Sequence, residues 1–137
     1  MNLSATSPTP KPADAALAKR ILYIDDDDIF ASLVKTVCER KGHQVTVCLE
    51  SAQALDALEK TPGAWDLVIT DHRMPGPDGL EIARILREKY PGLPCVMVSS
   101  LITDSLTRAA ADAGVRRLLH KPYKPDHLIV LIELATR

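Results

Sequence analysis

Five short apolar segments alternate with five helix-patterned segments along this chain, and this alternation limits the folds open to it. The apolar segments span residues 20–24, 43–49, 65–70, 93–100 and 115–120. Their length and their content of Val, Ile and Leu are typical of strands buried on both faces. Strands that alternate with helices form a parallel sheet covered by helices on both faces and joined by right-handed crossovers. We therefore predict an α/β fold in three layers.

The segments between these strands repeat apolar residues every three or four positions, as amphipathic helices do. The first carries such a stripe from Ile29 to Cys38 and is closed by Gly42, and Ser51 is predicted to cap the second. The Ala-rich fourth helix is expected over residues 104–113, and the last one follows Pro125. The stretch DHRMPGPDG, rich in Pro and Gly, is predicted to be a loop.

Composition fits one globular domain, because 46% of the 137 residues are hydrophobic and 26% are charged. The net charge of −1 argues against a generally basic nucleic-acid-binding protein. No apolar run reaches membrane-spanning length, and the N-terminus lacks the apolar middle of a secretory signal. Residues 1–18 are predicted to be a flexible tail before a domain at 19–137. Cys38, Cys48 and Cys95 are expected to be buried thiols in a reducing cytosol.

Polar side chains gather at the predicted carboxyl ends of the strands. Asp25 and Asp26 follow the first strand, Asp71 the third, Ser99 ends the fourth and Lys121 follows the fifth. In an open parallel sheet these ends meet at one edge. Three carboxylates can share a proton or bind a hard divalent cation, and the second use fits better beside a hydroxyl and an ammonium group. Asp71, alone on the middle strand, is the candidate nucleophile for a phosphoryl group.

The segments ILYIDDD, DLVITDHRMPGPDG, VMVSS and HKPY occur in this order, with 46 residues from Asp25 to Asp71, 28 on to Ser99 and 22 on to Lys121. Together they resemble the receiver domain of bacterial two-component response regulators, of the chemotaxis-regulator kind. The likeness runs from about residue 20 to residue 136. It implies a flavodoxin-like (βα)5 sandwich whose parallel sheet has the strand order 2-1-3-4-5.

The resemblance also implies a role for each acidic residue. Asp71 is expected to accept the phosphoryl group, and Asp26 and Asp71 are expected to bind Mg²⁺, or Mn²⁺ in its place, together with the backbone carbonyl of Arg73. Asp25 is expected to act on the metal largely through a bound water. In this register Asp28 is predicted to cap the first helix, which leaves Asp27 without a role.

The resemblance assigns Lys121 to the phosphoryl oxygens and Ser99 to a hydrogen bond with the phosphate that carries the switch. It implies a cis peptide bond between Lys121 and Pro122. Leu118 stands where many receivers carry Tyr or Phe, so a muted or differently transmitted switch is expected. Three further residues are expected to shape the loop after the acceptor: Met74, Pro75 and Gly79.

These residues lead to the hypothesis of a cytoplasmic signalling receiver that catalyses only its own phosphorylation and dephosphorylation. The expected phosphodonor is a sensor histidine kinase or a histidine phosphotransfer protein. Output is expected through contact with an unknown downstream protein or through a phosphorelay, with a homodimer through the fourth helix, fifth strand and fifth helix as a further option. Direct binding of nucleic acid or membrane is not expected.

Three alternatives stay open at this point. The chain could be a receiver fragment of a larger hybrid kinase or multi-domain regulator. It could be a phosphatase of the haloacid-dehalogenase type with Asp25 as its nucleophile, although the chain looks too short for that fold with a cap and Asp71 would be left unexplained. It could also use the receiver fold only as an interaction module that is never phosphorylated.

Overall fold

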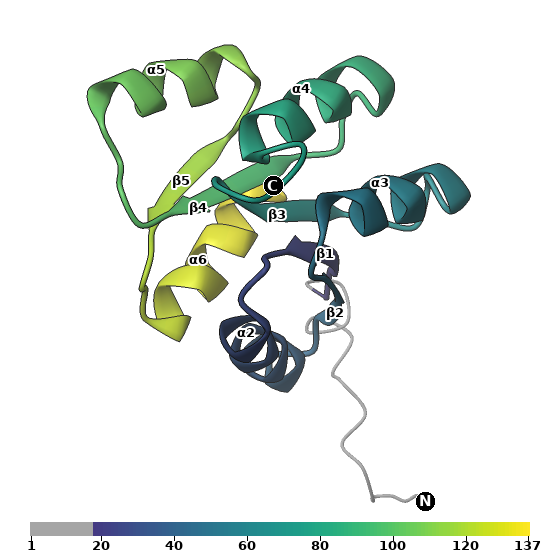
Figure 1. Ribbon diagram of the computed structural model, residues 1–137. Helices are drawn as coiled ribbons and strands as arrows, with labels where there is room; N and C mark the ends of the chain where they lie inside the picture. The colour runs from purple at the N-terminus through teal and green to yellow at the C-terminus, as the bar shows by residue number, and fades with distance from the viewer. Residues whose placement is uncertain (1–17) are drawn as a thin grey trace, which may run out of the picture.

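Strands and helices alternate strictly along the part of the chain that the structure describes. This computed structural model describes residues 18–137, and its element labels are those of Figure 1. Along the chain the elements are β1 (Arg20–Ile24), α2 (Asp28–Arg40), β2 (Gln44–Cys48), α3 (Ser51–Lys60), β3 (Leu67–Asp71), α4 (Gly79–Lys89), β4 (Cys95–Ser99), α5 (Asp104–Asp112), β5 (Arg117–His120) and α6 (Pro125–Ala135). All strand pairs are parallel, and the order across the sheet is β2-β1-β3-β4-β5. The predicted α/β fold and strand order are confirmed.

The sheet forms the middle of three layers. Helices α2 and α6 cover one face, and α3, α4 and α5 cover the other (Figure 1). In β1, Ile21 and Tyr23 pack toward α2 and α6, whereas Leu22 and Ile24 pack toward α3 and α4, and all four are fully buried. Burying each such side chain stabilises the fold by about 1.5–3 kcal/mol. The continuous apolar run of a central strand therefore follows from burial on both faces.

The strand boundaries differ from the predicted ones by a few residues. The predicted strands at 43–49, 93–100 and 115–120 are each shorter in the structure, because their outer residues lie in the irregular connecting segments. Asp71 itself is the last residue of β3, where it pairs with Val98 of β4. The candidate acceptor is thus part of the sheet and not of the loop that follows it.

Two predicted helix caps are wrong. Asp27, not Asp28, caps α2: its carboxylate accepts a hydrogen bond from the Phe30 N–H at 3.0 Å, and Asp28 is the first helical residue. Ser51 does not cap α3, because it is the first residue of that helix and its hydroxyl donates to the Pro77 carbonyl. The Asp27 cap is a local contact, whereas the Ser51 hydroxyl is engaged by a segment 26 positions away.

Other predictions concern the cysteines, the tail and the membrane. All three cysteines are free and buried, as predicted, and burial raises the pKa of the Cys38 and Cys95 thiols to about 12. The predicted flexible tail at 1–18 falls almost wholly outside the described residues. Between residues 18 and 137, no helix has the length and apolar content needed to cross a bilayer.

Gly79 sits where the loop after β3 returns to the sheet. It is buried, its N–H donates to the His72 carbonyl at 2.9 Å, and it begins α4. A β-carbon there would lie 2.5 Å from the Asp71 carbonyl oxygen and 2.9 Å from the Met97 sulfur. Only a residue without a side chain lets α4 approach the end of β3 this closely.

Gly79→Ala is therefore expected to lower the free energy of unfolding by about 1–3 kcal/mol, because the new methyl group meets backbone as well as a side chain. Urea unfolding measures this loss. Gly63→Ala is the matched control, since a β-carbon at Gly63 meets no described heavy atom within 4 Å. It should change stability by less than about 0.5 kcal/mol. Equal urea midpoints for the two variants would contradict the packing argument.

Candidate functional site

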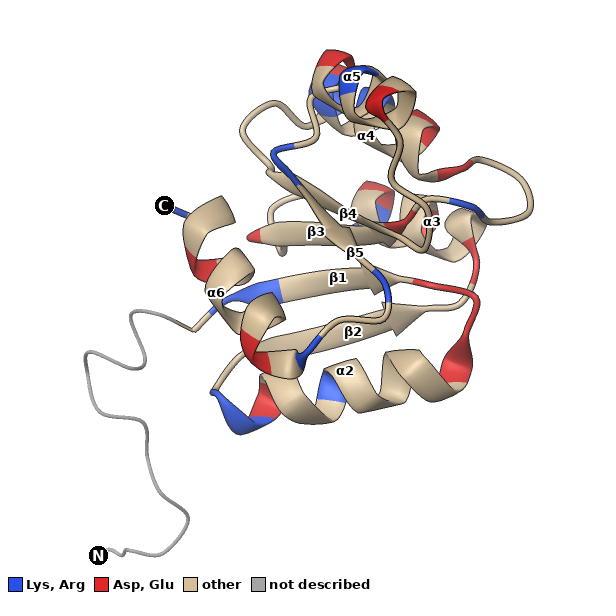
Figure 2. Ribbon diagram, turned by 90° about the vertical axis from the view of Figure 1, so that its left-hand side faces the viewer, with Lys and Arg blue, Asp and Glu red and all other residues tan. Residues whose placement is uncertain are grey.

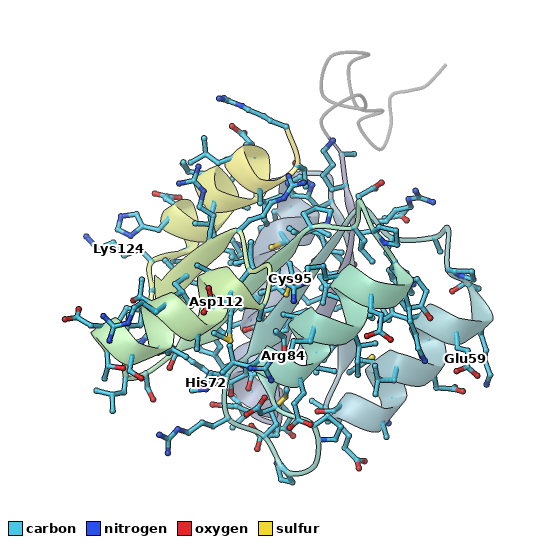
Figure 3. All side chains as sticks on the ribbon, turned by 90° about the horizontal axis from the view of Figure 1, so that it is seen from above. Glu59, His72, Arg84, Cys95, Asp112 and Lys124 are labelled. Carbon is cyan, nitrogen blue, oxygen red and sulfur yellow. The ribbon has the colours of Figure 1, made fainter. Side chains whose placement is uncertain are left out.

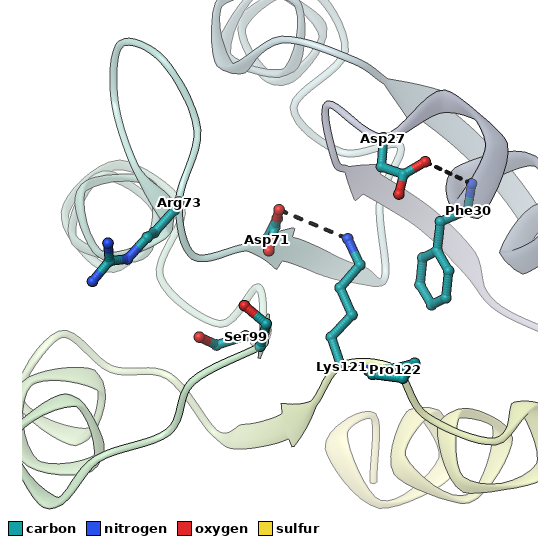
Figure 4. A pocket seen from close by; sticks show the side chains of 8 residues that line it. Asp27, Phe30, Asp71, Arg73, Ser99, Lys121 and Pro122 are labelled. Atoms are coloured by element: carbon teal, nitrogen blue, oxygen red, sulfur yellow. Dashed lines mark hydrogen bonds and ion pairs between the residues drawn. The ribbon is translucent and has the colours of Figure 1, made fainter.

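Residues from four strands meet at the carboxyl edge of the sheet. Asp25 follows β1. Asp71 and Ser99 end β3 and β4, and Lys121 follows β5 (Figure 4). One carboxylate oxygen from each of Asp25, Asp26 and Asp71 lies within 4.8 Å of the other two. The parallel register places all of these strand ends side by side, so the predicted gathering of Asp25, Asp26, Asp71, Ser99 and Lys121 at one edge is what the structure shows.

Negative charge is concentrated where β1 passes into α2. Figure 2 shows this connection as a continuous acidic stretch at the end of the sheet. Asp27 and Asp28 are exposed, and Asp27 is tied to the start of α2 by its cap. Asp26 is also exposed, but its carboxylate reaches the oxygens of Asp25 and Asp71. The run of four aspartates therefore divides into a pair whose carboxylates cluster with Asp71 and a pair that begins the helix, although Asp27 also lines the hollow over Asp71.

Asp25 is completely buried, and hydrogen bonds compensate its charge. Its Oδ1 accepts from the Asp27 N–H at 3.0 Å. Its Oδ2 accepts from the Lys121 ammonium at 2.7 Å and from the Tyr23 hydroxyl at 3.2 Å. An ionised carboxylate without such partners would be very costly in this position.

Lys121 reaches two carboxylates at once. Its ammonium lies 2.7 Å from the Asp25 Oδ2 and 3.9 Å from the Asp71 Oδ2, and only 16% of its side chain is exposed. The Phe30 ring lies against it, with the ammonium 4.7 Å from the ring centroid. This arrangement holds one positive charge between two acids, where a transferred group with several negative oxygens would also be attracted.

The pKa of the Asp71 carboxyl group is higher than that of an ordinary aspartate. Partial burial is the largest cause, and the neighbouring charges of Asp25 and Asp26 add to it, while Lys121 and the His72 N–H act in the opposite direction. Together they raise the pKa of Asp71 from 3.8 to about 6. Three carboxylates surround one ammonium group, so the site carries more negative charge than its own cation balances. A bound divalent cation would remove this excess, and carboxylate oxygens are the ligands that Mg²⁺ prefers.

A hollow of about 410 Å³ opens over Asp71. Ser99 and Arg73 both line it, but among the described residues neither side chain donates a hydrogen bond to the Asp71 carboxylate. The buried Ser99 hydroxyl donates to the Leu101 carbonyl at 2.9 Å, and the Arg73 guanidinium points away from Asp71 (Figure 4). The hollow leaves room for a group the size of a phosphate above the acceptor.

The remaining residues singled out in the sequence surround this edge. The peptide bond between Lys121 and Pro122 is cis, the conformation that the resemblance implies. Leu118 is half-buried and packs against Met97, Leu106 and Ala110. Met74 and Pro75 line a second hollow, of about 350 Å³, next to Asp26.

Sequence reasoning missed three aromatic residues of the site: Tyr23, Phe30 and Tyr123. Tyr23 was visible only as one more apolar residue of a strand, and Tyr123 only as the end of the HKPY segment. The structure brings the two tyrosine hydroxyls within 3.3 Å of each other and stacks Phe30 edge-on against Tyr123. The one available signal was a tyrosine at a fully buried strand position, since a buried hydroxyl needs a partner.

Comparison with known families gives a single clear result. The family described as the response regulator receiver domain matches residues 21–133 of this chain. The DNA-binding response regulator MtrA of Mycolicibacterium smegmatis is 29% identical over 121 residues, which make up 88% of this chain and 52% of the relative. The cyclic di-GMP phosphodiesterase response regulator RpfG of Xanthomonas campestris is 33% identical over 117 residues, 83% of this chain and 31% of the relative. The chain spans about half the length, or less, of these curated relatives.

Solved structures agree with this result. The receiver domain of the Francisella response regulator 1452 has a TM-score of 0.78 and 29% identity, and the match covers 86% of this chain and 96% of that one. The BeF3-activated N-terminal receiver domain of Klebsiella pneumoniae RstA has a TM-score of 0.78 and 25% identity, with coverage of 86% and 98%.

The raised pKa of Asp71 predicts how stability depends on pH. The folded protein binds this proton more tightly than the unfolded chain, so ionisation of Asp71 lowers the free energy of unfolding as the pH rises from about 4 to about 6. Without divalent ions, Asp71→Asn should therefore be more stable than the wild type at pH 7.5, by about 1–2 kcal/mol after allowance for partial exposure. The difference should shrink toward pH 4.

Urea unfolding at several pH values measures this difference. Glu59→Gln is the control, because Glu59 points outward from α3 at the edge of the molecule (Figure 3) and should show no such pH-dependent gain. An Asp71→Asn variant that is no more stable than the wild type at pH 7.5 would contradict the electrostatic reading.

Proposed function

This chain belongs to the response regulator receiver domain family, and we propose that Asp71 is the side chain that accepts its phosphoryl group. A receiver domain is a signalling phosphoacceptor and not an enzyme that turns over a substrate. The observation that carries the proposal is the position of the Asp71 carboxylate, which lies under an open hollow, 3.9 Å from an ammonium group and beside two more carboxylates. This combination suits the transfer of a group that arrives with negative charge.

In the proposed transfer, a carboxylate oxygen of Asp71 forms a bond to phosphorus while the bond from phosphorus to a histidine nitrogen of the donor breaks. The electron pair of that bond leaves with the imidazole ring, which then binds a proton from solvent. Lys121 stabilises the phosphoryl oxygens from one side. Its hold on Asp25 and the packing of Phe30 restrict where the ammonium can lie.

Mg²⁺, or Mn²⁺ in its place, fits the acidic set. Three carboxylate oxygens lie within 4.8 Å of one another beside a single ammonium group, which indicates an uncompensated negative site. We assign the ion to Asp26, Asp71 and the backbone carbonyl of Arg73, with Asp25 acting through a bound water. When bound, the ion would neutralise charge on the acids and on the phosphoryl oxygens.

Ser99 is proposed to carry the response to phosphorylation. Its hydroxyl proton is engaged by the Leu101 carbonyl, so a hydrogen bond to a phosphoryl oxygen requires that this contact be given up. The loop after β4 would then move toward Asp71. Leu118, packed against Met97 and Leu106, has no aromatic ring to follow this movement inward. We therefore propose a muted change on the surface of α5, β5 and α6.

The family implies a histidine kinase as partner, and we propose that the phosphodonor is a sensor histidine kinase or a histidine phosphotransfer protein in the cytoplasm. Output is proposed through contact with a downstream protein, through a phosphorelay, or through a homodimer formed by α5, β5 and α6. In a hybrid kinase or multi-domain regulator the output would pass to neighbouring domains.

The receiver unit is proposed to be residues 19–137, which is supported by the start of β1 at Arg20.

Two rival functions have less support. A phosphatase with Asp25 as nucleophile would need an accessible carboxylate, but Asp25 is 0% exposed and both of its oxygens accept hydrogen bonds. An interaction module that is never phosphorylated would have no use for a lysine held between two acids. Binding of beryllofluoride, a phosphoryl mimic, separates this last option from a working receiver.

Incubation with acetyl phosphate and Mg²⁺ should add a single phosphate to the protein, detected as an intact-mass shift. Asp71→Asn should abolish the adduct, because the nucleophilic oxygen is exchanged for an amide. Asp56→Asn, a change of an exposed acid on α3, should leave it intact. An unmodified wild type across several small phosphodonors would count against the proposal, and so would an adduct that persists in Asp71→Asn.

The division of the four aspartates can be tested by metal binding. Asp26→Asn should weaken Mg²⁺ binding at least about tenfold, since ligand and near-ligand substitutions have effects of this size or larger. Asp27→Asn should bind Mg²⁺ like the wild type, because asparagine caps a helix as well as aspartate does. Calorimetric titration of both variants measures the difference. Equal losses would mean that total charge matters and the assigned register does not.

A further inference from the structure

Two tyrosines outside the set assigned above are connected to Asp25. The Tyr23 hydroxyl, from β1, lies 3.2 Å from the Asp25 Oδ2. The Tyr123 hydroxyl, from the segment after Pro122, lies 3.3 Å from the Tyr23 hydroxyl. We call these two residues the tyrosine pair. The pair spans 100 positions of sequence and joins the first strand to the segment that carries Lys121.

The direction of these hydrogen bonds follows from the chemistry of the groups. A carboxylate only accepts, so the single hydroxyl proton of Tyr23 is donated to Asp25. The Tyr23 oxygen can then only accept from Tyr123, which makes Tyr123 the donor in the second bond. Both hydroxyls stay protonated, because burial raises the pKa of each tyrosine well above its usual value. The pair therefore presents a fixed donor to the buried carboxylate.

Packing holds the pair in this orientation. Tyr23 is 0% exposed, and Tyr123 packs against the same core. The Phe30 ring meets the Tyr123 ring edge-on, with 5.3 Å between centroids and 85° between planes. Phe30 also touches the Lys121 ammonium. The Phe30 ring thus contacts Lys121, one side-chain donor to Asp25, and also Tyr123, the hydrogen-bond partner of the other side-chain donor, Tyr23.

Of the two side-chain donors to the Asp25 Oδ2, Lys121 is also assigned to the phosphoryl group, whereas Tyr23 is not. Lys121 lies 2.7 Å from this oxygen but 3.9 Å from the nearest Asp71 oxygen. To contact a phosphoryl group on Asp71, the ammonium has to loosen its hold on Asp25. Asp25 is fully buried, so losing this contact without another side-chain donor would be costly.

We propose that Tyr23, supported by Tyr123, is a positioning residue that keeps the Asp25 carboxylate hydrogen-bonded while Lys121 turns to the phosphoryl group. This inference rests on the proposed roles of Asp71 and Lys121. It assigns a function in the phosphorylated state to two hydroxyls whose removal leaves the aromatic packing in place.

Beryllofluoride binding at saturating Mg²⁺ is the first test. Tyr23→Phe should weaken beryllofluoride binding about tenfold, because a hydrogen bond to a charged group is lost in the state that most needs it. Tyr123→Phe should weaken it less, by about threefold. Tyr90→Phe is the matched control, since Tyr90 ends α4 at the opposite end of the sheet, and it should bind like the wild type. Wild-type affinity in Tyr23→Phe would overturn the proposal.

The double variant tests whether the tyrosines act in series. If Tyr123 acts only by orienting the Tyr23 hydroxyl, Tyr123→Phe should add nothing once Tyr23 is phenylalanine. Two independent contributions would instead multiply, so that the double variant binds about thirtyfold more weakly than the wild type. The multiplied loss would overturn the role of Tyr123.

A stability measurement needs neither metal nor phosphoryl mimic. The methionine of Lys121→Met cannot donate a hydrogen bond. Of the two side-chain donors to the Asp25 Oδ2 in the described residues, only Tyr23 then remains. Tyr23→Phe should then lower the urea midpoint more in the Lys121→Met background than in the wild type. An equal shift in both backgrounds would show that Tyr23 does not substitute for Lys121.

These measurements separate failure of the inference from failure of the proposed function. If the wild type and Tyr23→Phe bind beryllofluoride equally well, the proposed roles of Asp71 and Lys121 stand and the proposed role of the tyrosine pair is refuted. A wild type that binds no beryllofluoride removes the proposed function, and the urea measurement in the Lys121→Met background still decides whether Tyr23 supports Asp25.

Discussion

Repulsion among three carboxylates at one sheet edge is the constraint on which the rest of this structure depends. Two unit charges 4 Å apart interact by about 1 kcal/mol in water and by several-fold more near a protein interior. The fold balances them unequally: Asp25 is buried and fully hydrogen-bonded, whereas Asp71 keeps a raised pKa beneath an open hollow. The unbalanced part of the site is the part that faces solvent, and this is where a cation and a phosphoryl group are proposed to bind.

The sheet makes this arrangement possible because its strands are parallel. All five strands end at the same edge, so β1 delivers two acidic groups and β3, β4 and β5 one polar group each without any long loop. The apolar body of the same strands fills the two layers of core beneath them. Burial on both faces keeps the strand ends fixed relative to one another, which is what a site built from single side chains of distant segments requires.

Much of this could be predicted from the sequence, because strands and helices follow from local periodicity and strand ends follow from the fold class. The errors lie where two neighbouring residues were equally suitable or where a distant partner decides. Asp27 and Asp28 can both cap a helix, and the bond from the Asp27 N–H to Asp25 favours the first. Ser51 finds its acceptor 26 positions away at Pro77. The tyrosines of the pair lie 100 positions apart, and the only local signal for them is the buried strand position of Tyr23.

The distance in sequence between Asp25 and Lys121 has a consequence for the time at which the site comes into being. These two residues are 96 positions apart, and the segment that carries Lys121 follows the last strand of the sheet. A chain still emerging from the ribosome therefore has Asp25 and Asp71 but not yet the Lys121 ammonium group that pairs with them. Asp71 would be able to accept a phosphoryl group only after β5 has joined the sheet and Lys121 is in place. An incomplete chain would therefore not be phosphorylated.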